Sequence, residues 1–383
     1  MVRLILIVFF FLLSLLSVFR APTNLLWYAA ILVTEFPWIF IIIEIGLLLW
    51  GFKVDRFAGA GNFLALISIG LYLVPIITAS VISRSVQAGV QQSFPTDVPS
   101  ARSPFSAFRM FTAFAGNDYP FRTMTYTSGA AHALTLDFYS SALPGDRPCV
   151  LVVHGGSWAG GNSRQLPQLN AHLAKGGYHV AAINYRLAPA HVFPAQIEDI
   201  HAALAFLKEQ SRDLKIDTAN FVLLGRSAGG QLVLSASYGH KMNGIKGVIA
   251  FYGPADLVWG AQNPANPWVF NSNEVLQNFL GGGFDKLPQA YAAASPVLKV
   301  DGNTPPTLLL HGQLDVLVAY EHSIRLQKRL QEFRIPHYLL TLPWATHGFD
   351  YTLAGPGGQL STYCVDKFLK AVTHRKDGKQ GSD

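Results

Sequence analysis

The sequence predicts an α/β protein, a mostly parallel sheet of eight strands with helices on both faces, preceded by about three apolar helices. Two observations lead to this prediction. From residue 121 onward, short apolar runs alternate with amphipathic helical segments. Residues 1–83, by contrast, contain three long apolar segments and few charges. The chain of 383 residues is long enough to hold both parts.

The apolar segments cover residues 2–19, 25–50 and 62–82. Each is near the roughly 20 residues that a helix needs to cross a bilayer, so we expect residues 1–83 to form a membrane anchor. A cleaved signal peptide is the alternative for the first segment, but its apolar run is long and no small-residue cleavage site precedes Arg20. Glu35 and Glu44 are expected to face other helices or the interface, because a carboxylate in hydrocarbon is costly.

The charges that flank these segments bear on orientation. With the N-terminus inside, Arg3, Lys53 and Arg56 face the cytoplasm, and Arg20 and Arg84 lie outside. With the reverse orientation, Arg20 and Arg84 are inside. The positive-inside rule slightly favours the first arrangement, a multi-pass membrane protein whose remaining chain lies on the outer, or periplasmic, side.

Residues 121–374 are predicted as one globular domain, after a linker at 84–120 that is rich in Ser, Pro, Gln and Phe, and before a basic tail at 375–383. The first two strands alternate polar and apolar residues, as half-buried antiparallel strands do, and the others are short apolar runs typical of parallel sheets. The predicted strands are 122–128, 133–140, 149–156, 178–186, 220–225, 245–253, 305–312 and 337–343. The predicted helices are 168–175, 194–210, 227–239, 318–333 and 357–372.

Residues 256–300 break this alternation and are too long for a simple connection. Their aromatic side chains include Trp259, Trp268, Phe270 and Phe279. The segment is predicted either as a lid or pocket wall, or as a helical excursion with its own small core. If it is a wall, Trp158, Trp259 and Trp268 are the candidate pocket side chains.

Ser227 lies in the sequence Gly225-Arg226-Ser227-Ala228-Gly229, between a predicted strand and a predicted helix. The glycines permit a tight strand-to-helix turn, so we expect Ser227 to be a nucleophile held at the end of the sheet. The alternative is a serine that only caps the following helix. Arg226 is expected near the mouth of the site and receives no role.

The sequence His154-Gly155-Gly156-Ser157-Trp158 follows a buried strand. Its glycines let the backbone bend so that N–H groups point into the site. Together with the N–H of Ala228, this loop is predicted to bind an oxyanion. The alternative is an ordinary glycine-rich turn. His154 itself is expected to be a scaffold residue.

A serine hydroxyl needs a base and the base needs an acid. Asp315 follows the strand predicted at 305–312 and His347 follows the strand at 337–343, which gives the order Ser, Asp, His. The competing acids are Asp256 and Asp350, and the competing histidines, His311 and His322, are interpreted as structural.

No other chemistry is indicated. The net charge of +6 comes without a basic run interleaved with aromatics, which disfavours a nucleic-acid partner. Cys149 and Cys364 lie far apart and fit neither a disulfide framework nor a metal site, so we expect no metal and no cofactor.

The stretches HGGSW, NYRLAPAHVFPAQIEDI, LLGRSAGGQL, PPTLLLHGQLDVLV and THGF resemble the hormone-sensitive-lipase-like and feruloyl-esterase-like carboxylesterases of the α/β-hydrolase fold, over residues 120–372. The resemblance implies a triad of Ser227, His347 and Asp315, and oxyanion donors from Gly156, Ser157 and Ala228. Ser157 stands where hormone-sensitive-lipase-like members usually carry a third glycine. The HGGxW form is more similar to the feruloyl-esterase-like, kynurenine-formamidase-like and isoprenylcysteine-methylesterase-like branches, the last of which is also membrane-bound.

Arg186 and Asp199 also match the family and are interpreted as a scaffold pair near the sheet edge. The expected activity is hydrolysis of a small-molecule or lipid ester through an acyl-enzyme. An amidase, formamidase or serine peptidase of the same fold is the alternative, and a catalytically silent receptor or scaffold is a third hypothesis.

Overall fold

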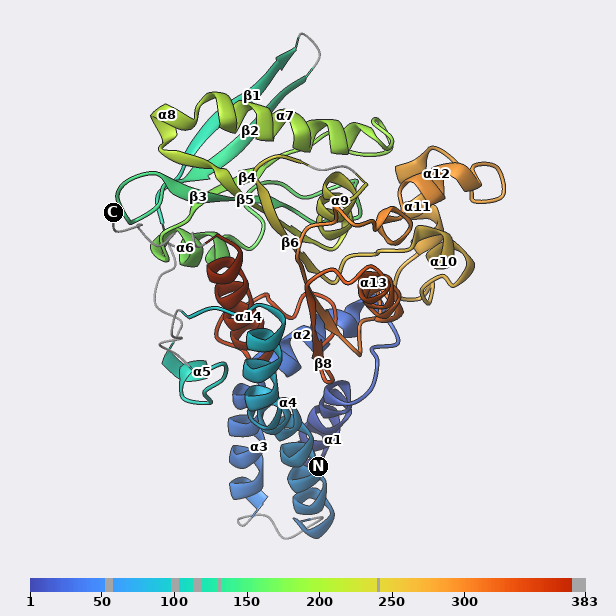
Figure 1. Cartoon of the computed structure of the whole chain (residues 1–383). Helices are drawn as coiled ribbons and strands as arrows, with labels where there is room; N and C mark the ends of the chain where they lie inside the picture. Colours follow the sequence, from blue (N-terminus) through green and yellow to red (C-terminus); the bar gives the residue numbers. More distant parts are fainter. Residues whose placement is uncertain (52–57, 98–102, 113–118, 130–131, 240–241, 374–383) are drawn as a thin grey trace.

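The computed structural model describes residues 1–51, 58–97, 103–112, 119–129, 132–239 and 242–373. Figure 1 shows a sheet domain with its helices above a narrow stalk of long helices that contains the N-terminus. The basic tail predicted at 375–383 lies outside the described residues, as do Lys53 and Arg56.

The domain is built on one sheet of eight strands in the order β1-β2-β4-β3-β5-β6-β7-β8. β1 and β2 pair antiparallel, β2 pairs antiparallel with β4, and the remaining neighbours are parallel, so the predicted antiparallel start and parallel body are confirmed. The strands are β1 (Arg122–Gly129), β2 (His132–Tyr139), β3 (Arg147–Val153), β4 (His179–Ile183), β5 (Ile216–Arg226), β6 (Ile245–Phe251), β7 (Thr307–Gly312) and β8 (His337–Leu342).

Helices cover both faces of the sheet, because the central strands are apolar on both sides. One face packs on α7 (Ala195–Glu209), α9 (Ala228–Ser237) and α13 (Glu321–Glu332). The other packs on α6 (Pro167–Lys175), α14 (Pro356–Thr373) and the C-terminal part of α4 (Ala58–Ser93). Short helices α5 (Arg109–Thr112) and α8 (Ser211–Leu214) complete the connections.

The segment at 256–300 forms α10 (Leu257–Gln262), α11 (Ser272–Leu280), α12 (Pro288–Ala293) and η2 (Pro296–Lys299). Its Leu276, Phe279 and Tyr291 belong to the same buried cluster as α7 and α9. A separate small core, the second prediction for this segment, is therefore wrong.

The stalk differs from the prediction of about three transmembrane helices. Among the described residues, only α4 is long and apolar enough to cross a bilayer, and a second span exists only if α2 (Asn24–Glu35) and α3 (Pro37–Gly51) count as one, although they bend by 86°. α1 (Val2–Ser14) with η1 (Leu15–Ser17) is too short, because a helix rises about 1.5 Å per residue. The bend coincides with Pro37 at the start of α3, where the proline ring cannot continue the preceding helix.

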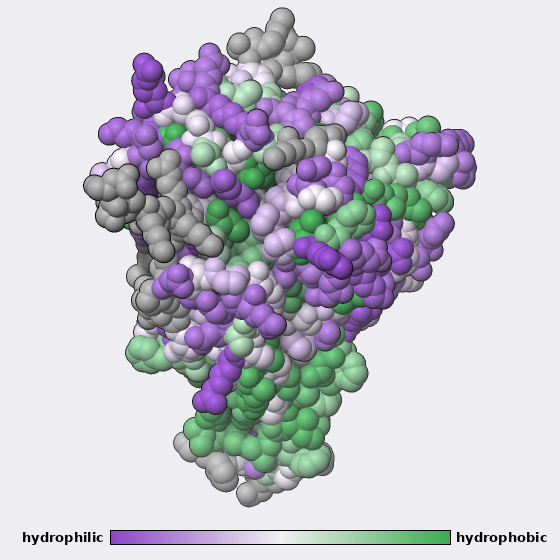
Figure 2. All heavy atoms as spheres, viewed as in Figure 1, coloured by the Kyte–Doolittle hydropathy of each residue, from purple (hydrophilic) through white to green (hydrophobic). Residues whose placement is uncertain are grey.

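The stalk surface is apolar where α1, α3 and α4 run together below the sheet domain (Figure 2). Exposed side chains there include Ile5, Phe9, Ile42, Phe63 and Leu66. The last turns of α4 lie in the segment expected as a linker, since this helix runs to Ser93. The division into anchor, linker and domain stays a prediction.

Glu35 and Glu44 are both buried against protein. The carboxylate of Glu35 accepts hydrogen bonds from the backbone N–H groups of Gly357 and Gly358, at 3.0 Å and 3.3 Å. These groups begin α14, and the first N–H groups of a helix have no intrahelical acceptor. Glu35 therefore caps a helix of the sheet domain from within the apolar segment.

Candidate active site

Ser227 lies on the turn between β5 and α9, in a conformation that side chains rarely adopt, with φ 54° and ψ −121°. Its N–H donates to the carbonyl of Phe251 on the neighbouring strand at 2.9 Å, which holds the turn against the sheet. A Cβ on Gly225 would collide with the backbone of Gly229, and one on Gly229 with the backbone of Val153. Glycine is thus required at both positions because three backbones approach each other closely. The strained backbone of Ser227 is a separate feature, and such strain is concentrated at functional sites.

Asp315 and His347 meet at the carboxyl ends of β7 and β8. His347 Nδ1 lies 2.7 Å from Asp315 Oδ2, and both residues are buried. Asp315 Oδ1 accepts from the N–H groups of Leu317 and Val318, each at 2.9 Å. The carboxylate is therefore fixed on both oxygens and oriented toward the imidazole.

The electrostatics favour an ionised Asp315. Burial acts to raise the pKa of its carboxyl, but the charges and hydrogen bonds of His347 and His311 outweigh burial and hold the pKa below its ordinary value. A carboxylate that stays charged beside an imidazole fixes its tautomer and stabilises the imidazolium form.

The competing acids serve other partners. Asp256 caps α10 by accepting from the N–H of Trp259 at 2.9 Å and pairs with Arg325 at 2.8 Å. Asp350 accepts from Arg226 Nε and from the Tyr252 hydroxyl, both at 2.5 Å.

The competing histidines contact other partners, and their interpretation as structural residues stays a prediction. His311 contacts Ser323 Oγ at 2.7 Å and the carbonyl of Val318 at 3.0 Å, beside the carboxylate of Asp315. His322 accepts from the N–H of Asp256 at 3.2 Å, and burial lowers its pKa to about 3, so it is neutral near pH 7.

Arg226 does not lie near the mouth of the site as expected, since only 2% of its surface is exposed. Its ion pair with Asp350 joins the strand that ends just before Ser227 to the loop that carries His347. Tyr252, which binds the same carboxylate, places its ring 4.2 Å from the His347 ring. Sequence reasoning missed this cluster because its members lie on three separate strands and loops.

The glycine-rich loop after β3 has three successive residues with positive φ, which are Gly156 (113°), Ser157 (56°) and Trp158 (59°). The N–H of Gly155 donates to Gln165 Oε1 at 2.7 Å, so this group is engaged. Ala228 is the first residue of α9, and its N–H has no acceptor within the helix. The predicted donors Gly156, Ser157 and Ala228 thus lie on backbone whose N–H groups are not committed to a helix ladder.

His154 is a scaffold residue in this structure. Its Nδ1 lies 2.7 Å from the carbonyl of Gly155 and its ring stacks on Tyr185 at 4.2 Å. Burial lowers the pKa of His154 to about 4, which keeps the ring neutral. The predicted scaffold pair is also confirmed, with Arg186 and Asp199 joined at 2.8 Å.

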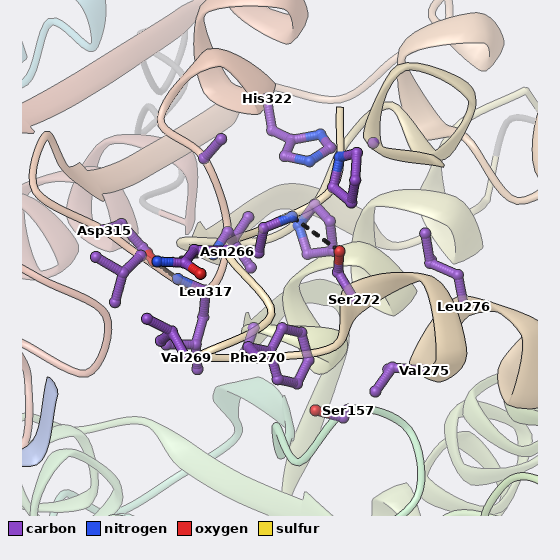
Figure 3. Close-up of a pocket in the computed structure, with 18 of the residues that line it drawn as sticks. Ser157, Asn266, Val269, Phe270, Ser272, Val275, Leu276, Asp315, Leu317 and His322 are labelled. Atoms are coloured by element: carbon purple, nitrogen blue, oxygen red, sulfur yellow. Dashed lines mark hydrogen bonds between the residues drawn. The ribbon is translucent and has the colours of Figure 1, made fainter. Parts of the chain in front are cut away.

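A cavity of about 460 Å³ contains the predicted Ser157, Trp158, Ser227, Ala228 and Asp315 in its lining. Apolar side chains form most of the rest, and several come from the segment at 256–300. Figure 3 labels Val269, Phe270, Val275, Leu276 and Leu317 around this space. This segment therefore forms a wall of the cavity.

The three tryptophans predicted to line the pocket lie in different places. Trp158 lines the cavity, where its indole stacks on Phe279 at 4.1 Å and donates to Gln231 at 2.9 Å. Trp259 lies outside the cavity lining, against His322, and 79% of Trp268 is exposed. The expectation that Trp259 and Trp268 line the cavity is not met.

The connector between η1 and α2 also lines the cavity, through Arg20, Ala21 and Pro22. Arg20 Nη2 donates to the carbonyl of Gln313 at 3.2 Å, two residues before Asp315. No local pattern in the sequence places an apolar N-terminal segment beside a loop almost 300 residues later. Within the described residues, no group of three or more His, Cys, Asp or Glu side chains could hold a metal ion.

Comparisons with known proteins agree with this architecture. A family model described as BD-FAE matches residues 136–330, about half of the chain. The probable carboxylic ester hydrolase LipM of Mycobacterium tuberculosis is 29% identical over 248 residues, which are 60% of this chain and 56% of that protein. Esterase LipC of the same organism is 29% identical over 60% of this chain and 59% of that protein. The chain thus spans less than two thirds of the length of these relatives.

Solved structures share the fold at low identity. A bacterial heroin esterase superposes with a TM-score of 0.60 and 21% identity, over 78% of this chain and 100% of that chain. Esterase LipW from Mycobacterium marinum gives a TM-score of 0.59 and 18% identity, over 78% of this chain and 91% of that chain.

Proposed function

The chain belongs to the BD-FAE family, and from this premise we propose that it is a serine carboxylesterase whose triad is Ser227, His347 and Asp315. The observation that supports the proposal best is the 2.7 Å contact between His347 and a buried, doubly anchored Asp315. Ser227 lies on a strained turn at the same end of the sheet.

In this mechanism Ser227 Oγ attacks the ester carbonyl and His347 Nε2 takes its proton. The N–H groups of Gly156, Ser157 and Ala228 bind the oxyanion. His347 then protonates the leaving alcohol, and water releases the acid from the acyl-enzyme by the same steps in reverse. Asp315 orients the imidazole throughout. No hydrogen bond joins Ser227 to His347 in the described structure, and such contacts are often long before substrate binds.

The cavity suits an apolar acyl group. Its volume of about 460 Å³ lies in the range of small-molecule sites, and apolar side chains dominate its lining. We propose a small-molecule or lipid ester as the substrate.

We further propose that the protein is bound to a membrane through α4, with α1 and α3 beside it. The support is the length and hydropathy of α4 and the apolar surface of the stalk. Placement of the sheet domain on the outer or periplasmic side stays a prediction from the flanking charges.

The proposal is tested by labelling with a fluorophosphonate, which reacts with activated serines, followed by hydrolysis of p-nitrophenyl esters of increasing acyl length. Wild type is expected to label and to hydrolyse esters, and Ser227→Ala to do neither. Ser140→Ala, at an exposed serine, is the matched control and should behave as wild type.

Absence of labelling in the folded wild type would instead favour a catalytically silent receptor or scaffold. Labelling with faster turnover of aryl formamides or dipeptides than of esters would favour the formamidase or peptidase alternative. Esterase activity retained by Ser227→Ala would refute the assignment of the nucleophile.

A further inference from the structure

One helix of the apolar N-terminal segment lies against the loop that carries His347. Figure 1 shows α2 between the stalk and the sheet domain, near α14. The indole Nε1 of Trp27 donates to the backbone carbonyl of His347 at 3.0 Å. The two rings are also in edge contact, with centroids 6.3 Å apart and planes at 60°.

The same face of α2 holds this loop at two further points. Ile31 packs against Gly348, whose φ of +84° marks the bend directly after His347. Glu35 accepts from the N–H groups of Gly357 and Gly358, where α14 begins. Trp27, Ile31 and Glu35 are spaced four residues apart, which places them in one row along a helix.

The imidazole of His347 is also held by two residues of the sheet domain. Asp315 holds its Nδ1, and the Tyr252 ring lies 4.2 Å from it. Its backbone lies on a loop with a positive-φ glycine at the next position. A donor bound to the carbonyl of His347 itself therefore fixes the point from which the side chain extends.

We propose that Trp27 is a positioning residue for His347, so that α2 couples the apolar N-terminal segment to the catalytic step. The inference rests on the function proposed above. In the described part of the chain, Trp27 meets the proposed catalytic groups through His347, so it acts through the histidine. A shift of about 1 Å in a base is enough to slow proton transfer substantially.

The test replaces Trp27 by Phe in the full chain, purified in detergent, with a short p-nitrophenyl ester that does not need a membrane. We expect kcat to fall about tenfold, because the hydrogen bond that orients His347 is lost, and KM to stay nearly unchanged. Labelling by a small fluorophosphonate, which does not fill the acyl cavity, should slow by a similar factor. Trp50→Phe, at an exposed tryptophan near the end of α3, is the matched control and should leave both rates unchanged.

A second variant separates the hydrogen bond from packing. Trp27→His keeps a ring N–H and is expected to recover much of the lost kcat at equal thermal stability. Equal loss in Trp27→Phe and Trp27→His, or a wild-type rate in Trp27→Phe, would overturn the proposal. If Ser227→Ala is inactive in the same assay, the proposed function survives that outcome. Should Ser227→Ala remain active, it is the proposed function that fails.

Discussion

The carboxylate of Asp315 makes more contacts than it needs to orient the imidazole of His347. Two backbone N–H groups, the imidazole of His347 and the nearby His311 surround its carboxylate. Burial acts to raise the pKa of the carboxyl, but the charges and hydrogen bonds of His347 and His311 favour the charged form and hold the pKa below its ordinary value of 3.8. Asp315 is therefore also a source of pH-dependent stability.

This linkage gives a prediction with a definite sign. Because the folded pKa lies below the unfolded one, Asp315 stabilises the fold above about pH 4, and this contribution is lost as the pH falls through the folded pKa. Thermal midpoints measured from about pH 6 down to about pH 2 should fall more steeply for wild type than for Asp315→Asn. Parallel curves for the two proteins would show that the carboxyl does not titrate abnormally.

The site residues differ in how well the sequence predicts them. Ser227, Asp315 and His347 each follow a strand, and parallel strands bring their carboxyl ends to one edge, so local patterns suffice. Arg226 and Trp27 make hydrogen bonds to partners 124 and 320 residues away, and nothing near them in the sequence indicates those partners.

At the level of elements, α2 is the least expected. The sequence shows an apolar run that continues through residue 50, typical of a membrane span. The structure instead ends α2 at Glu35 and turns the chain by 86° into α3. In the sequence, Glu35 interrupts an apolar run, where a carboxylate would be energetically costly in a membrane span. In the structure, Glu35 accepts hydrogen bonds from the first N–H groups of α14. Its role could not be predicted because it depends on tertiary contact and not on periodicity.

Removal of this acceptor should destabilise the protein measurably. Glu35→Leu leaves the buried N–H groups of Gly357 and Gly358 without their acceptor, at a cost of about 1–3 kcal/mol in the free energy of unfolding. Glu35→Gln keeps an acceptor oxygen and should lose less. Thermal unfolding in detergent would measure both. A Leu variant as stable as wild type would mean that water or another group replaces the carboxylate.

The eight strands were the most predictable elements, since each combines an apolar run with a glycine, proline or polar end. The segment at 256–300 was less predictable from the sequence. Its aromatic residues predicted a wall, but Trp259 and Trp268 are not part of the cavity lining, whereas Val269, Phe270 and Leu276 are. Short helices of six to nine residues leave little periodicity from which to assign a face.

At the scale of the whole molecule, an apolar stalk supports a polar sheet domain (Figure 2). α4 joins the two, because its first part carries exposed apolar side chains and its last part packs on the sheet with α14. Because α4 belongs to both parts, the sheet domain would lie close to the surface of the membrane that the stalk is proposed to enter.

Membrane binding can be measured by extraction with alkaline carbonate. Wild type should stay with the membrane fraction, and Phe63→Arg with Leu66→Arg should be released or fail to insert, since an arginine costs up to about 2.5–3.5 kcal/mol at the centre of a span and less toward its ends. Gln92→Arg, at an exposed position in the last turn of α4, is the control and should be retained. Complete extraction of wild type would refute the proposed anchoring.

The contact between Trp27 and His347 also concerns the order of events during synthesis. The two residues are 320 positions apart, so α2 emerges from the ribosome long before its partner loop exists. Contacts of such long separation close late in folding. We therefore expect the turn at Ser227 to form once β3, β5 and β6 are made, and His347 to reach its final position only when β8 and α14 dock onto α2, which is synthesised long before them.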